Sequence, residues 1–253
     1  MKPAKDIRNI SFFLILSAAL IFLPSEAKAN IAFVAASSAG ADSGVLTLTI
    51  NMPTGTVQDD VMIASIGARP NTATITAPSG WTLVRRIDNA NSIANSLAVY
   101  SKVASASEPA SYSWTFDTST GSAGGIQTFS GVNTTTPIDV ENGQNTASGL
   151  THATPDVTTT VANTMIVTSH SFATAATWTP PTGMTEGFDV ASLAVPNAVG
   201  QSTEGNFALQ SAAGPTGTKT ATASNDADVG NTHILALRPV NFRVTDPRRS
   251  HRG

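Results

Sequence analysis

Apolar and polar residues alternate with a period of two over several short stretches of this chain. In residues 111–116 the side chains of Tyr112, Trp114 and Phe116 fall on one face, and three hydroxyl-bearing side chains fall on the other. This is the pattern of a β-strand with one buried face. No stretch carries a convincing apolar stripe at the helical period of 3.6 residues. The pattern therefore predicts an all-β chain.

The predicted strands form two groups. Pro-Ser-Gly at 78–80 and Pro-Thr-Gly at 181–183 predict tight turns just before matching strands. The first group comprises residues 45–50, 61–66, 81–87, 96–103, 111–116 and 125–129. The second group comprises residues 156–161, 165–172, 184–190, 206–212, 219–223 and 233–237.

The second half of the chain echoes the first. Residues 59–65 match 163–169, and 75–82 match 178–185. Looser matches join 97–99 to 207–209 and 125–129 to 233–237. The order is kept while the offset drifts, as duplication with small loop insertions would produce. Chance resemblance between Thr-rich strands is the alternative.

The predicted fold is a two-sheet antiparallel β-sandwich of jelly-roll type built from two diverged repeats, residues 45–132 and 155–240, which share a core. Two separate small sandwiches are the alternative. Residues 133–155, rich in Thr, Asn and Gly, join the repeats either as a linker or as a surface crossover.

The N-terminus predicts export. Lys2, Lys5 and Arg8 precede an apolar run at 10–23, and an Ala-x-Ala site ends at Ala29. This is the pattern of a secretory signal peptide, and the run falls short of the ~20 apolar residues of a membrane anchor. We therefore expect a signal peptide at 1–29, a sandwich domain at 30–240 and a basic disordered tail at 241–253. The expected location is secreted, extracellular or at the cell surface, with the periplasm as the alternative and no integral membrane span after cleavage.

The composition limits how the domain can be stabilised and which partners it can bind. The chain has no cysteine, so an exported domain of this kind must rely on apolar burial and sheet hydrogen bonds. Residues 30–240 carry 6 Lys and Arg against 14 Asp and Glu, a formal charge of −8. This balance disfavours nucleic acid as a partner.

Three further segments carry a family resemblance. Residues 75–86, 97–104 and 108–114 read ITAPSGWTLVRR, LAVYSKVA and EPASYSW, and a Gly-Gly-Ile follows at 124–126. Together they resemble a repeated β-sandwich module of secreted bacterial surface proteins. The resemblance implies an extracellular β-rich module that often stands beside adhesive or sorting domains, and it brings no enzymatic residues. Asp59 departs from the pattern, because the module usually has Gly there.

The candidate sites are few. His152, His170, His233 and His251 have no metal-binding spacing, and Ser169-His170-Ser171 lacks a nucleophile elbow and an assignable acid, so no catalytic residue is predicted. Paired acids suit Ca²⁺, although a solvated turn is the favoured interpretation of each pair, and no other cofactor is expected. The candidate metal ligands are Asp139, Glu141, Asp226 and Asp228.

Aromatic residues beside turns are candidates for ligand contact. Trp81 and Trp178 flank corresponding turns, and we expect at least one of them to be exposed as a stacking surface for a sugar ring. Trp114 lies in an alternating strand and is expected in the core.

These observations predict an exported, non-enzymatic surface or extracellular-matrix protein with an adhesive or structural role. Its expected partners are extracellular polysaccharide or other surface proteins. A carbohydrate-binding module is the alternative. A phage-tail-like receptor-binding module or a glycan hydrolase comes third.

Overall fold

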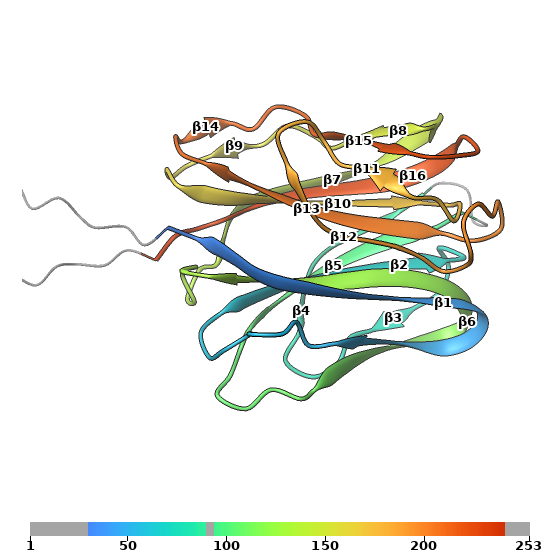
Figure 1. The fold of residues 1–253 in the computed structure, drawn as a ribbon, viewed down its shortest axis with the longest axis horizontal. Coiled ribbons are helices and arrows are strands. Elements are labelled where there is room, and N and C mark those ends of the chain that lie inside the picture. The colour runs from blue at the N-terminus through green and yellow to red at the C-terminus, as the bar shows by residue number, and fades with distance from the viewer. Residues whose placement is uncertain (1–29, 90–93, 241–253) are drawn as a thin grey trace, which may run out of the picture.

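A computed structural model describes residues 30–89 and 94–240, and these residues form β-strands without any helix (Figure 1). The prediction of an all-β chain is thus confirmed, and the strand pairs within its sheets are antiparallel. No helix of the described ranges could cross a membrane. The expected signal peptide and basic tail lie outside the described residues.

Two large sheets dominate the fold. The first has the order β1 (Ala32–Asn51), β6 (Ser111–Ser130), β2 (Val61–Arg69), β5 (Ser96–Val103), β4 (Thr82–Asp88), with β3 (Ile75–Thr76) also paired to β6. The second has the order β7 (Ile138–Gly149), β16 (Asp228–Leu237), β10 (Thr164–Phe172), β13 (Ser202–Gln210), β12 (Thr185–Ala191). Two small sheets complete the fold: β11 (Trp178–Thr179), β15 (Thr220–Ala223) and β8 (Thr151–Ala153) form one, and β14 (Gly214–Pro215) and β9 (Thr158–Thr159) form the other.

The large sheets lie face to face and each is covered on its outer side, which gives a β-sandwich-like arrangement (Figure 1). The cover of the first sheet comes from the sheet itself. β1 and β6 are each 20 residues long and curl at one end of the molecule. Beyond the curl, the second half of β1 pairs with the first half of β6, and this pair lies beneath the sheet. The cover of the second sheet is the small sheet β11-β15-β8. This layering explains why the central strands are buried along almost their whole length.

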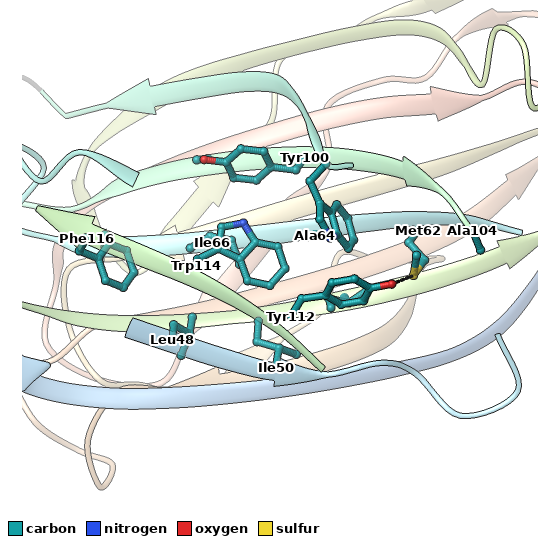
Figure 2. Packing of buried hydrophobic residues seen from close by; sticks show 14 residues of the cluster. Leu48, Ile50, Met62, Ala64, Ile66, Tyr100, Ala104, Tyr112, Trp114 and Phe116 are labelled. Carbon is teal, nitrogen blue, oxygen red and sulfur yellow. Dashed lines mark hydrogen bonds between the residues drawn. The ribbon is translucent and has the colours of Figure 1, made fainter. Parts of the chain in front are cut away.

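β2 shows how one strand serves two cores. Met62 and Ile66 point into an outer cluster around Trp114, which is fully buried as expected (Figure 2). Val61 and Ile63 point the other way, into a cluster that also contains residues of the second sheet. Successive side chains of a strand face opposite sides, so a strand between two cores must be apolar on both.

The core between the large sheets is apolar at one end and polar at the other. Phe129 of β6 packs on Phe207 of β13, with ring centroids 6.0 Å apart. Farther along, the hydroxyl groups of Ser65 and Ser169 form a buried hydrogen bond of 2.7 Å between β2 and β10. The sheets therefore share one interior, held by both apolar contacts and hydrogen bonds.

The segment at 133–155 is structured, contrary to its interpretation as a linker or surface crossover. Its residues 138–149 form strand β7, which pairs with β16 at the edge of the second sheet. Glu141 of this strand accepts two hydrogen bonds from Arg85 of the first sheet, at 2.7 and 2.9 Å. The segment is thus part of the packing between the large sheets.

Asp59 and Asn163 occupy the same place before the central strands β2 and β10. Both have a positive φ, of 70° and 59°. Glycine adopts this conformation most readily, and Asn and Asp tolerate it better than other residues. The position therefore suits Asp and Asn better than most residues other than Gly.

Candidate functional site

The two ends of the described chain meet at one end of the molecule (Figure 1). The amide of Val240 donates to the carbonyl of Gly131 at 2.9 Å, and a Cβ added at Gly131 would lie 2.7 Å from the carbonyl oxygen of Asn30. Val132 and Pro239 form a β-bridge beside them. The opposite end, called the distal end below, is therefore the part of the fold that lies farthest from both chain ends.

An apolar loop stands at the distal end. It joins β12 to β13 and contains Val195 and Val199, whose relative exposures are 40% and 73%. Beside the loop lies an open cavity of about 340 Å³ lined by Asp42, Arg69, Pro70, Gly121, Ser192, Leu193 and Val199. Exposed apolar side chains grouped around a hollow are characteristic of contact surfaces.

Arg69 fixes this loop to the body of the fold. It lies at the end of β2, and its guanidinium donates to the carbonyl oxygens of Ala173, Ala198 and Gly200. The first carbonyl follows directly after β10 of the second sheet, and the other two belong to the loop. One side chain thus joins both large sheets and the loop at the distal end.

The expected exposure of Trp81 or Trp178 is wrong. Their relative exposures are only 8% and 7%, so both indoles are core side chains. Trp81 packs on Trp114 at a centroid distance of 5.4 Å, and the indole nitrogen of Trp178 donates to the Ser202 hydroxyl at 3.0 Å. An indole can stack on a sugar only with a ring face open to solvent, and each of these indoles is instead packed into the core of its own half.

The candidate calcium ligands are not gathered into one site. The described residues contain no cluster of three or more His, Asp or Glu side chains suited to a metal ion. Asp139 accepts hydrogen bonds from Thr160 and Arg238, and Glu141 is held by Arg85. Of the other two candidates, Asp228 accepts from the Val229 amide, and Asp226 has a φ of 41° in the turn before β16.

Glu141 instead joins the two large sheets through charge. His233 of β16 shares a hydrogen bond of 3.0 Å with the carboxylate that also binds Arg85. The hydrogen bond from His233, together with Arg85, lowers the pKa of Glu141 to about 2, although partial burial acts in the other direction. Ionised Glu141 is thus favoured by folding.

Glu141→Gln is expected to lower the free energy of unfolding by about 1–2 kcal/mol at neutral pH. The folded pKa lies below the unfolded value of 4.5, so this contribution is present above pH 4.5 and is lost as the pH falls toward 2. Urea unfolding over this range measures it. Asp88→Asn, which breaks the exposed Arg86–Asp88 pair, is the control and should change stability by less than ~0.5 kcal/mol. A constant difference between Glu141→Gln and the parent protein at all pH values would contradict the assignment.

A row of polar side chains crosses the outer face of the second sheet. The register places Asp189, Glu204, His170 and Thr232 side by side on β12, β13, β10 and β16. His170 and Glu204 are fully buried under the small sheet β11-β15-β8. In the first sheet the same places in β2 and β5 hold Ile66 and Ala98, which are apolar. The second sheet thus has an acid and a base where the first sheet has apolar side chains.

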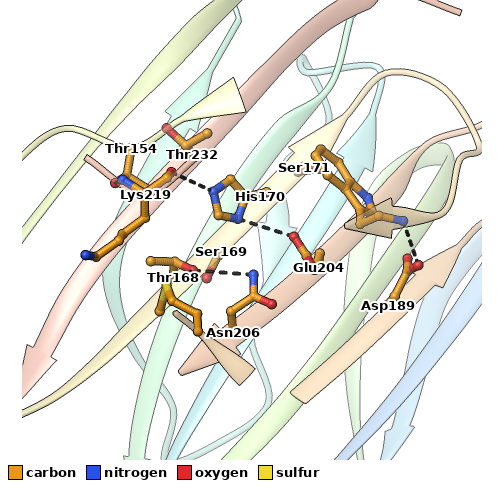
Figure 3. A network of polar contacts seen from close by, with 12 residues as sticks. Thr154, Thr168, Ser169, His170, Ser171, Asp189, Glu204, Asn206, Lys219 and Thr232 are labelled. Carbon is orange, nitrogen blue, oxygen red and sulfur yellow. Dashed lines mark hydrogen bonds and ion pairs between the residues drawn. The ribbon is translucent and has the colours of Figure 1, made fainter. Parts of the chain in front are cut away.

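The row has unsatisfied hydrogen-bonding atoms. Among the described residues no well-formed hydrogen bond reaches either carboxylate oxygen of Glu204, His170 Nδ1 or Asn206 Oδ1, although the Asn206 side chain lies close enough to Glu204 to act on its pKa. His170 Nδ1 lies 3.6 Å from Glu204 Oε2, and His170 Nε2 lies 3.3 Å from the Lys219 carbonyl oxygen (Figure 3). Native proteins satisfy most buried polar atoms, so this cluster is an exception that calls for an explanation.

Burial sets the ionisation of the row. It raises the pKa of Glu204 to about 8, against a smaller opposing effect of the Asn206 side chain, and it lowers the pKa of His170 to about 4. Asp189 accepts a hydrogen bond from the Trp178 amide, yet burial raises its pKa to about 6. At neutral pH the row thus contains a protonated acid beside a neutral imidazole.

No protein-family model matches the chain, and the searches of curated proteins and of solved structures found no match either.

Proposed function

We propose that the chain is an exported, non-enzymatic module that acts at a cell surface or in an extracellular matrix, where its role is adhesive or structural. The observation that carries the proposal is the placement of both chain ends at one end of the fold and of the exposed apolar loop at the other. A module attached through its chain ends presents its distal end outward. The resemblance to bacterial surface modules and the signal-peptide pattern support the same role.

The internal geometry supports a stabilising rather than a catalytic use of the polar residues. Glu141 joins the large sheets, Arg69 holds the distal loop, and the His170–Glu204 pair lies beneath a sheet. A catalytic acid or base must reach a substrate, and the latter pair has no exposed atom. The carbohydrate-binding alternative has less support, because both candidate indoles are buried.

We also propose that the fold arose by duplication, as the sequence pattern predicts. The two large sheets have corresponding strand orders, and the edge strands β4 and β12 carry a register shift at the same place. Ser65 and Ser169, 104 residues apart, meet each other across the sheets, as equivalent residues do on a twofold axis. In this proposal each repeat contributes one large sheet together with the layer that covers it, so the fold has more layers than the two-sheet jelly-roll predicted from the sequence.

Labelling on intact cells tests surface display. The chain has no cysteine, so Val199→Cys places a single thiol at the distal end. Val57→Cys is the matched control, because Val57 is 63% exposed but lies in the loop between β1 and β2, at the end with the chain termini. We expect a membrane-impermeant maleimide to label Val199→Cys strongly and Val57→Cys weakly on the cells that produce the protein.

Both thiols should react equally in purified protein, which controls for intrinsic reactivity. Labelling of Val199→Cys only after cell lysis would contradict surface display. Equal labelling of both thiols on intact cells would contradict attachment through the end that carries the chain termini.

A further inference from the structure

The protonation of His170 follows from its partners. A carbonyl oxygen can only accept a hydrogen bond, so the Nε2 atom that faces the Lys219 carbonyl must carry a hydrogen. In the neutral imidazole the Nδ1 atom is then an acceptor, and it faces Glu204. Two acceptors face each other unless one proton lies between them.

The surroundings of Glu204 offer no other source of that proton. His170 of β10 is its neighbour on one side, and Asp189 of β12 is its neighbour on the other. Glu186 of β12 adds a further negative charge, and His152 of β8 acts on His170 from the covering sheet. The Lys219 ammonium points away from the pair (Figure 3). No cation among these groups is placed to neutralise an ionised Glu204.

We infer that His170 and Glu204 form a binding site for a single proton, and that loss of this proton loosens the small sheet β11-β15-β8 from the large sheet beneath it. The small sheet contacts the pair directly, through the Lys219 carbonyl before β15 and through the Trp178 ring, whose centroid lies 6.0 Å from that of His170. A buried carboxylate whose one nearby donor is the Asn206 side chain needs further donors from water, and the covering sheet separates it from water.

The sign of the effect follows from linkage. The pKa of Glu204 is raised from 4.5 to about 8 by folding, so its contribution to stability is complete below pH 4.5 and is lost as the pH rises through 8. His170 acts in the opposite direction, because its lowered pKa costs stability as the pH falls from 6.5 toward 4. The cover is therefore held most firmly in mildly acidic conditions.

Quenching of Trp178 by acrylamide tests the inference. In a chain with Trp81→Phe and Trp114→Phe, Trp178 is the one remaining tryptophan and lies in the cover. We expect its quenching constant to rise several-fold as the pH passes from below to above the Glu204 pKa of about 8. Adding Glu204→Gln should abolish this rise, because a neutral amide has no proton to lose. The control Glu186→Gln, on the neighbouring strand and exposed, should retain it.

Infrared difference spectroscopy detects the protonation of Glu204 directly, without depending on movement of the small sheet. We expect a protonated-carboxyl band that disappears as the pH rises through the same range and that Glu204→Gln lacks. Absence of this band in the parent protein at neutral pH would overturn the proton site. A pH-independent Trp178 quenching constant, or an equal rise in Glu204→Gln, would overturn its coupling to the cover.

Discussion

Phe129→Ala is expected to lower the free energy of unfolding of the whole domain by about 3–5 kcal/mol, the range for removing a fully buried phenylalanine ring. Phe129 has no exposed surface, and its ring contacts Phe33 of its own sheet and Phe207 of the opposite sheet. The cavity would therefore open between the two large sheets, where neither sheet can fill it alone.

Urea unfolding followed by circular dichroism measures this loss. Val199→Ala removes methyl groups from an exposed apolar side chain and should change stability by less than ~0.5 kcal/mol. A loss below ~1 kcal/mol for Phe129→Ala would mean that the large sheets do not share the core described above.

Trp114→Ala should cost a similar 3–5 kcal/mol, although Trp114 lies on the outer side of the first sheet, far from the second. If the halves unfold as one unit, the loss must also be felt in the second half. Trp178 reports that half, since it packs on Phe172 in a separate cluster. We expect the thermal unfolding transition seen by Trp178 fluorescence to shift to the same lower temperature as the unfolding of the first half.

The measurement uses Trp81→Phe as the background, so that Trp178 is the single tryptophan once Trp114 is removed. Calorimetry of the same variant should show one transition. If Trp178 instead unfolds at its original temperature while a second transition appears below it, the halves are independent and the two-sandwich alternative is correct.

The central strands could be predicted from the sequence because they are apolar, and the edge strands β4 and β12 were predicted as well, whereas β7 and the first half of β1 were not. β2 and β5 are rich in Val, Ile, Leu and Ala, and both lie between two cores. β7 and the first half of β1 are rich in Ala, Ser, Asn, Gly and Thr, and they stand at the edges of the sheets. These two segments gain their place from backbone pairing with a neighbour, which leaves little trace in side-chain hydrophobicity.

The strand registers agree with one of the matches that the sequence predicts between the halves and differ from another. The registers place 125–129 opposite β2 as they place 233–237 opposite β10, in agreement with the predicted match. Residues 97–99 correspond instead to 203–205, four positions before the predicted 207–209. An even shift leaves every side chain on the same face of its strand, so alternation alone cannot detect it.

The polar row was missed for a different reason. Nothing near His170 in the sequence indicates an acid partner, because Glu204 lies 34 residues away on β13. The match between the halves does indicate a buried group, because the match of 59–65 to 163–169 extends by one position to Ile66 and His170. A histidine at the place of a core isoleucine indicates a buried polar group that needs a partner.

Asn30 and Val240 both lie beside Gly131, so the two ends of the described chain could be joined and new ends opened elsewhere in the fold. A short peptide could join Val240 to Asn30, and a cut in the exposed loop between β12 and β13 would then create new termini at the distal end. Such a circular permutant keeps every strand pair of the sheets, because no pairing depends on the original ends. For the same reason the domain could be inserted into a surface loop of a host protein, which it would enter and leave at a single point.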